Sequence, residues 1–226
     1  MIDYTTWSLE FQKIIACSQC STLTCKNLLR DSEENIPQPG FVGKDFEAKR
    51  VLLVGQNPAI TKSDWALSAD RPYTAALRKL RDSPTEDSLR SLLSTARDFM
   101  PSWRVHQDYF PLLECGLTLD QLAYTNVVRC RTARLNPKKL KLEDTPPNRR
   151  VAEQCTGLHF TRWVDALNPR VIIFIGKYAC YHGRSVAIER KIPFDFLNRE
   201  RSRSSDLRNA DRVRVANLVR SIVKGE

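Results

Sequence analysis

Residues 50–55 read RVLLVG and residues 170–176 read RVIIFIG, two apolar, β-branched runs that each end in glycine. Continuous apolar runs of this length are typical of strands that are buried on both faces, as in a parallel sheet. Weaker strand candidates follow at residues 122–128 (LAYTNVV) and 192–197 (IPFDFL). Helical patterns lie at residues 73–80, 85–98, 149–167 and 210–223. This alternation predicts an α/β fold of three layers, with a mainly parallel four-stranded sheet between helices and function at the carboxyl ends of the strands.

The length and composition of the chain fit one domain. The 226 residues are 42% hydrophobic, which suffices for a buried core, so we expect a single domain over residues 1–226. No apolar run is long enough to span a membrane, and the N-terminus lacks the layout of a secretory signal, so we expect a cytoplasmic protein. We also expect a monomer. Two stretches that mix proline with charge, residues 31–49 and 132–150, are predicted to be surface loops.

The chain is strongly basic, with 36 Lys and Arg residues against 26 Asp and Glu residues and a net charge of +10. Such a charge favours a polyanionic partner, because neutralising phosphates releases their counterions. Nucleic acid is the partner we expect, and a basic surface without a partner stays open as the alternative.

Seven cysteines in a chain without a secretion signal indicate that disulfides are not to be expected. Cys17 and Cys20 form a CxxC motif, and Cys130 and Cys155 flank the region between the third strand and a helix. Four thiolates can hold zinc or a 4Fe-4S cluster, and the spacing does not choose between them. The alternative is that these four are buried apolar cysteines. The remaining three are expected to be ordinary cysteines: Cys25, Cys115 and Cys180.

Polar side chains follow two of the expected strands. The first strand runs into GQNPA, whose glycine and proline make a rigid turn that presents Gln56 and Asn57, and Asn126 ends the third strand. Two carboxamides at neighbouring strand ends can converge on one pocket and hydrogen-bond a base edge. A plain turn at GQNPA and a structural role for Asn126 are the alternatives.

Five motifs in order carry a resemblance to a known family. They are VLLVGQNPA, DRPYTAALRKL, YTNVVRCR, PPNRRVAEQC and NPRVIIFIGKYA. From Cys17 to Ala179 the chain resembles the iron-sulfur uracil-DNA glycosylases, families four and five of the uracil-DNA glycosylase superfamily. The resemblance implies a monofunctional DNA glycosylase that flips a modified base out of DNA and hydrolyses its N-glycosidic bond, leaving an abasic site.

The same resemblance assigns roles to individual residues. It implies that a structural 4Fe-4S cluster is ligated by Cys17, Cys20, Cys130 and Cys155. The spacing between the last two is longer than is usual in the family, which fits an insertion around residues 136–145.

The resemblance makes GQNPA the water-activating motif, with Gln56 and Asn57 as catalytic residues. It makes Asn126 the residue that reads the flipped base, and Gly55 is expected to contact that base as well. Tyr73 falls where the family has an aromatic ring that stacks on that base. Alternatively, Tyr73 opens a helix after a proline.

Two departures from the family pattern concern catalysis. The iron-sulfur families have an acidic residue and an alanine where this chain has Gln56 and Asn57. The family's His-Pro-Ser type motif is replaced by FLNRERSRSSDLR, without histidine, so Arg199 or Arg201 is the candidate to neutralise the departing base anion or clamp a phosphate. A solvated basic loop is the alternative. The histidines are expected on the surface or on helices: His106, His159 and His182.

Three functions follow from these observations. The first is a glycosylase for uracil or another deaminated base. The second is the same chemistry on a bulkier modified base, because the altered motif and the lost histidine imply a remodelled pocket. The third is a catalytically silent iron-sulfur module that binds DNA or a partner.

Overall fold

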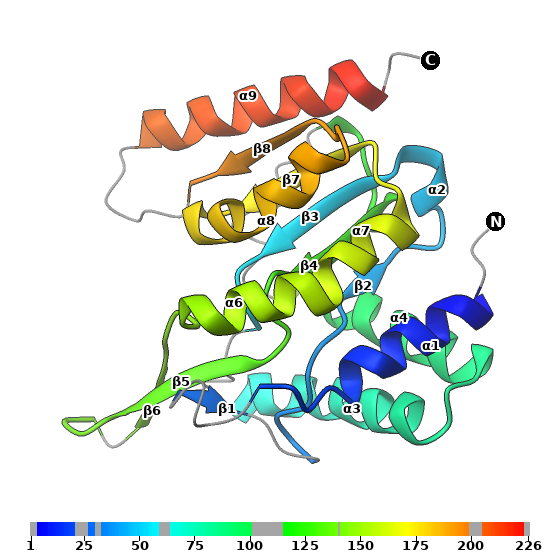
Figure 1. Cartoon of the computed structure of the whole chain (residues 1–226), viewed down its shortest axis with the longest axis vertical. Helices are drawn as coiled ribbons and strands as arrows, with labels where there is room; N and C mark the ends of the chain where they lie inside the picture. Colours follow the sequence, from blue (N-terminus) through cyan, green and yellow to red (C-terminus); the bar gives the residue numbers. More distant parts are fainter. Residues whose placement is uncertain are drawn as a thin grey trace. The chain divides into compact units, whose positions relative to one another are not determined.

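The computed structural model describes residues 4–20, 27–29, 33–58, 64–100, 115–139, 141–198 and 205–223. The chain forms two compact units, each assembled from three segments. One unit comprises residues 1–39, 57–99 and 128–159, and it is called the helical unit below. The other comprises residues 40–56, 100–127 and 160–226, and it is called the sheet unit (Figure 1). The expectation of a single domain stays a prediction.

The sheet unit contains a five-stranded sheet in the order β2-β4-β3-β7-β8. All four predicted strands are present, and they pair in parallel. They are β3 (Val51–Gly55), β4 (Leu122–Asn126), β7 (Val171–Ile175) and β8 (Phe194–Leu197). The sequence pattern missed β2 (Phe41–Val42), which adds to β4 in the antiparallel direction. The α/β class is confirmed, with five strands in place of four.

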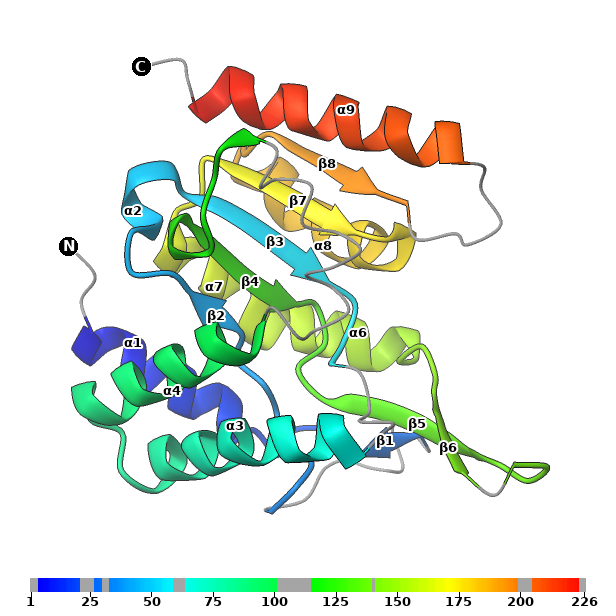
Figure 2. The same ribbon diagram turned by 180° about the vertical axis from the view of Figure 1, so that it is seen from behind.

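Helices flank this sheet. In both views α7 (Thr161–Leu167) and α8 (Lys177–Glu189) lie on the same face of the sheet (Figures 1 and 2). Helix α8 packs closely because Gly183 meets the Phe174 ring, which would lie 2.5 Å from an added Cβ. Helix α9 (Ser205–Val223) packs along β8. The unit also contains α2 (Phe46–Lys49) and the 3-10 turn η3 (Leu119–Gln121).

Polar contacts join α9 to β8 and to the residue before β7. Arg214 of α9 forms an ion pair with Asp195 of β8 and donates a 3.0 Å hydrogen bond to the carbonyl of Phe196. At the other end of α9, Arg170 donates a 2.6 Å hydrogen bond to the carbonyl of Ile222. The Arg170 contact gives one carbonyl of the last turn of α9 a partner that the helix itself lacks.

The helical unit combines helices with a small antiparallel sheet in the order β1-β5-β6. Its helices are α1 (Tyr4–Ile15), α3 (Asp64–Asp82), α4 (Glu86–Phe99) and α6 (Arg149–Cys155). Its strands are β1 (Leu28–Leu29), β5 (Arg131–Asn136) and β6 (Lys141–Asp144). A π-helical turn, Thr156–Phe160, lies between α6 and α7.

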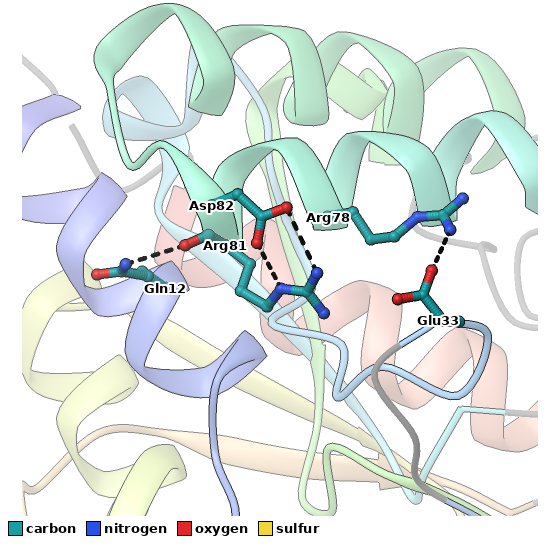
Figure 3. A network of polar contacts seen from close by, with 5 residues as sticks. All are labelled: Gln12, Glu33, Arg78, Arg81 and Asp82. Atoms are coloured by element: carbon teal, nitrogen blue, oxygen red, sulfur yellow. Dashed lines mark hydrogen bonds and ion pairs between the residues drawn. The ribbon is translucent and has the colours of Figure 1, made fainter.

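Polar contacts on α3 connect the N-terminal segment to the helices of this unit (Figure 3). Gln12 of α1 donates a 3.1 Å hydrogen bond to the carbonyl of Arg81, while the Arg81 side chain pairs with Asp82 at 2.8 Å. Arg78 pairs with Glu33 at 2.6 Å on the surface. Gln12 precedes the CxxC segment and Glu33 follows it, so the chain contacts α3 on both sides of that segment.

Several sequence-based expectations were wrong. Residues 132–150 form the β5–β6 hairpin and the start of α6, and residues 31–49 contain β2 and α2, where surface loops were expected. The charge and prolines of residues 132–150 hid β5 and β6, whereas β2 is a buried pair of two residues and is too short to give a pattern. Helix α3 continues through Pro72 and begins nine residues before the expected start, and α1 was missed. Within the described ranges, no helix has the length and apolar character needed to cross a membrane.

Candidate functional site

The carboxyl ends of β3 and β4 bring Gly55 and Asn126 together. The two residues are paired in register, and the Val127 amide donates a 2.9 Å hydrogen bond to the Gly55 carbonyl. A Cβ atom at Gly55 would lie 2.4 Å from Oδ1 of Asn126, so only glycine leaves room for this carboxamide. Asn126 is 3% exposed. The expectation that the carboxamides after β3 converge with that of Asn126 stays a prediction.

Tyr124 orients the carboxamide of Asn126. Residues two apart on a strand face the same way, and the Tyr124 hydroxyl donates a 2.9 Å hydrogen bond to Oδ1 of Asn126. This bond leaves the Nδ2 hydrogens as donors and one lone pair of Oδ1 as an acceptor. A buried carboxamide held in this way presents a defined donor and acceptor.

Asn57 begins the next segment of the helical unit. Its Nδ2 atom donates a 3.2 Å hydrogen bond to the hydroxyl of Thr132 on β5 and another of 3.2 Å to the carbonyl of Pro58. The Thr132 hydroxyl in turn donates to the carbonyl of Thr145. Because Nδ2 is held in this way, Oδ1 is the atom of the Asn57 carboxamide that can accept from a water.

The other predicted residues are placed differently or not described. Gln56 is half-buried directly after β3. Tyr73 lies on α3 with 1% of its surface exposed, so its predicted stacking role requires access to a ring that is buried in this structure. Arg199 and Arg201 lie outside the described residues, as do Cys25 and His106. His182 lies on α8, as predicted, against the rings of Tyr178 and Tyr181.

The four predicted ligand cysteines line one pocket of the helical unit. Cys20, Cys130 and Cys155 are buried and Cys17 is half-buried. The same pocket is also lined by Pro37, Val128, Arg129, Val151, Leu158 and His159. A CxxC segment, the loop after β4 and the end of α6 thus converge, although more than a hundred residues separate the first from the others.

Hydrogen bonds hold the sulfur atoms of this pocket in place. The Arg129 amide donates to Sγ of Cys155 at 3.4 Å, and Sγ of Cys20 lies 3.7 Å from Oε1 of Gln154. Burial raises the pKa of the Cys155 thiol to about 11, and the guanidinium of Arg129 acts in the opposite direction. A ligated thiolate therefore needs compensation for its burial, which a metal centre and the Arg129 cation can both provide.

The spacing of the four thiols bears on the kind of metal centre that the pocket could hold. In the part of the chain that the structure describes, no three His, Cys, Asp or Glu side chains lie close enough together to hold a single metal ion. Thiolates around a four-iron cluster stand farther apart than those around one ion, because the cluster itself is wider. Four thiols on one largely apolar pocket fit the donor set of such a cluster.

Sequence reasoning missed three residues that organise these sites. Tyr124 is visible in the sequence only as the residue two before Asn126. Thr132 has no local signal, since its contact with Asn57 spans 75 positions. Arg129 is 1% exposed and donates a 2.7 Å hydrogen bond to the Pro39 carbonyl, and its residue type gives no signal of this burial because arginine is mostly exposed in proteins.

The comparisons with known proteins agree with the resemblance at the level of the superfamily. Among curated proteins no match was found. A family model described as the uracil DNA glycosylase superfamily matches residues 43–208, which include β3, β4, β7 and β8. This match covers well over half of the chain and contains Gly55, Asn126, Cys130 and Cys155. The chain belongs to the uracil DNA glycosylase superfamily.

Proposed function

We propose that this protein is a monofunctional DNA glycosylase that releases uracil or a related deaminated base from DNA. The observation that carries the proposal is the buried Asn126 carboxamide, held against Gly55 by the Tyr124 hydroxyl at the end of β4. Superfamily membership supports DNA as the substrate, and so does the net charge of +10.

Asn126 has the hydrogen-bonding groups that a uracil-type base requires. Its Nδ2 can donate to O4 of the base while Oδ1 accepts from N3-H. Breaking the bond between the sugar and the base leaves negative charge on the base oxygens, so the Nδ2 donor contributes more in the transition state than in the ground state. Asn126 would then both select the base and stabilise it as a leaving group.

Asn57 would position the water. A carboxamide cannot take a proton as a carboxylate does, but Oδ1 can orient a water, and this suffices when the sugar has become strongly electrophilic. The water oxygen bonds to C1′ of the sugar, and the base leaves as an anion with the bonding electrons. The water loses a proton to solvent and the base anion takes one up, so the products are a free base and an abasic site. Arg199 or Arg201 stays our candidate for neutralising the base anion.

We also propose that Cys17, Cys20, Cys130 and Cys155 ligate a 4Fe-4S cluster. When bound, the cluster would join the CxxC segment to the end of α6 and would serve a structural role. The shared pocket supports this proposal, as does the amide hydrogen bond to Cys155, because such bonds stabilise the sulfur ligands of clusters.

The proposed activity is tested by measuring abasic-site formation on a panel of duplexes that each carry one modified base. We expect the wild type to release uracil and Asn126→Asp to lose about ten-fold or more of that activity, because the carboxylate lacks the donor for O4. The same variant should gain some activity on cytosine, whose N4-H can donate to the carboxylate. Asn217→Asp, an exposed position on α9, is the matched control and should keep wild-type activity.

Other results select among the alternatives. Equal release of uracil by the wild type and by Asn126→Asp would show that Asn126 does not read the base. Release of a bulkier base with uracil left intact would assign the pocket to that base. An iron-loaded protein that binds DNA and releases none of the bases would be a silent module.

A further inference from the structure

The β5–β6 hairpin carries an apolar pair on a strongly basic ribbon. Leu135 and Leu142 are directly opposite each other in the register, so their side chains share one face. Leu135 is 59% exposed and Leu142 is 45% exposed. Ala133, two residues earlier on the same face of β5, is only 4% exposed. This face of the hairpin is therefore buried at Ala133 and exposed at Leu135 and Leu142.

The hairpin projects from its own unit. Figures 1 and 2 both show the connection between β5 and β6 lying beyond the helices of the helical unit. The turn is held by Asn136, whose Oδ1 accepts from the amides of Lys138 at 3.0 Å and Lys139 at 3.3 Å. Pro137 further limits the backbone of the turn. An exposed pair of leucines is thus presented on a preorganised ribbon.

The charge of the hairpin indicates what it binds. Residues 131–144 contain five Lys or Arg residues and two Asp or Glu residues. Arg134, Lys138 and Lys139 are exposed, and Lys139 forms a 3.0 Å ion pair with Glu143. Nucleic acid fits a leucine pair between cations, because its phosphates lie beside base edges that include the apolar methyl group of thymine.

We propose that the β5–β6 hairpin docks on duplex DNA, with Leu135 and Leu142 against base edges and the exposed cations beside phosphates. This inference rests on the proposed function for its choice of DNA as the partner. A two-stranded β-ribbon matches the width of the major groove, and a single strand of DNA has no groove to receive it. The hairpin therefore gives the protein a preference for double-stranded substrates.

The test uses binding and does not depend on catalysis. Affinity of the full-length protein is measured by fluorescence anisotropy for a duplex that holds a stable abasic-site analogue and for the same strand alone. We expect Leu135→Ser with Leu142→Ser to weaken duplex binding by about ten-fold and to leave single-strand binding unchanged, because serine cannot replace the apolar contact with bases in the groove. The matched control is Ile188→Ser with Val213→Ser, two residues of similar exposure on α8 and α9.

Two further variants separate the loss of apolar contact from misfolding and test a phosphate contact. Leu135→Met with Leu142→Met keeps the apolar surface and should retain duplex affinity, and unchanged unfolding midpoints would show that the serine variant folds. Lys138→Gln should reduce the slope of log K against log salt by about one, as expected for the loss of one phosphate contact.

The outcomes separate this inference from the proposed function. If the wild type releases no base from any duplex but the serine variant still loses duplex affinity, the function fails and the docking surface stands. If bases are released but the serine variant binds duplex as the wild type does, the docking surface is wrong and the function stands. Equal losses on single-stranded and double-stranded DNA would also overturn the proposed duplex preference.

Discussion

The hydroxyl of Tyr124 donates a 2.9 Å hydrogen bond to Oδ1 of Asn126, and both side chains are buried at the end of β4. The Asn126 carboxamide has two orientations of similar shape, which exchange the positions of Oδ1 and Nδ2. In this structure Oδ1 is the atom that accepts from the Tyr124 hydroxyl, which leaves the Nδ2 hydrogens as donors for another group. The specificity assigned to Asn126 therefore depends on its neighbour.

Tyr124→Phe removes this contact and keeps the ring. We expect base release to slow by about two- to ten-fold, because one buried hydrogen bond contributes about 0.5 to 1.5 kcal/mol net. Single-turnover rates on a uracil duplex measure the effect. Tyr181→Phe, on an exposed tyrosine of α8, should react at the wild-type rate. Wild-type rates for Tyr124→Phe would show that the hydroxyl does not orient the carboxamide.

Gly55→Ala tests the close approach of the two strand ends. The new Cβ would lie 2.4 Å from Oδ1 of Asn126 and 2.6 Å from the Tyr124 hydroxyl, so the carboxamide must move. We expect at least about a ten-fold loss of activity and a loss of stability of about 1 to 3 kcal/mol from overpacking. Gly157→Ala is the control, since nothing lies within 4 Å of its Cβ. Full activity in Gly55→Ala would contradict the proposed site.

Cys155→Ser tests the metal centre. Protein purified without oxygen should be brown and should contain iron and sulfide, and this variant should lose both the colour and the cluster. Cys180→Ser, at a half-buried cysteine of α8, should keep both. Analysis of iron, sulfide and zinc provides the measurement. A colourless, zinc-loaded wild type would overturn the cluster in favour of a zinc site.

Tyr73 is tested by a pair of substitutions that separate stacking from packing. Tyr73→Phe keeps the ring and should retain base release, whereas Tyr73→Leu should lose about ten-fold or more, because base stacking is worth about 1 to 3 kcal/mol. Rates should be measured well below each unfolding midpoint, since the ring is 1% exposed. If Tyr73→Leu weakens binding to undamaged duplex as much as it slows release, Tyr73 belongs to the core.

Asp165 and Arg190 predict a pH-dependent contribution to stability. The Arg190 guanidinium, 2.9 Å from Oδ2 through Nη2, lowers the pKa of the Asp165 carboxyl in the folded state. Because the folded pKa is below the unfolded value of about 4, the contribution is present above that value and is lost as the pH falls through the folded pKa. Asp165→Asn should cost about 0.2 to 1 kcal/mol at neutral pH and nothing in strong acid. Denaturant unfolding at several pH values measures this difference, and a cost that does not change with pH would contradict it.

The sequence alone predicts β3 and β7. It also predicts that polar residues lie at the ends of β3 and β4. Val51–Gly55 and Val171–Ile175 are buried on both faces, so their apolar composition is itself the signal of a parallel strand. The i, i+2 spacing of Tyr124 and Asn126 likewise places both side chains on one face without further information. The superfamily follows from ordered motifs along the chain.

Only the tertiary structure decided which distant residues meet. The register of Gly55 with Asn126 depends on the pairing of β3 with β4, and the contact of Asn57 with Thr132 spans 75 positions. The hairpin was not predicted because residues 131–144 are rich in charge and lack a regular alternation of apolar and polar residues, so only the pairing of the two strands identifies it. Burial is equally a property of the fold: Tyr73 and Arg129 are both 1% exposed, a fact that neither residue type nor spacing determines.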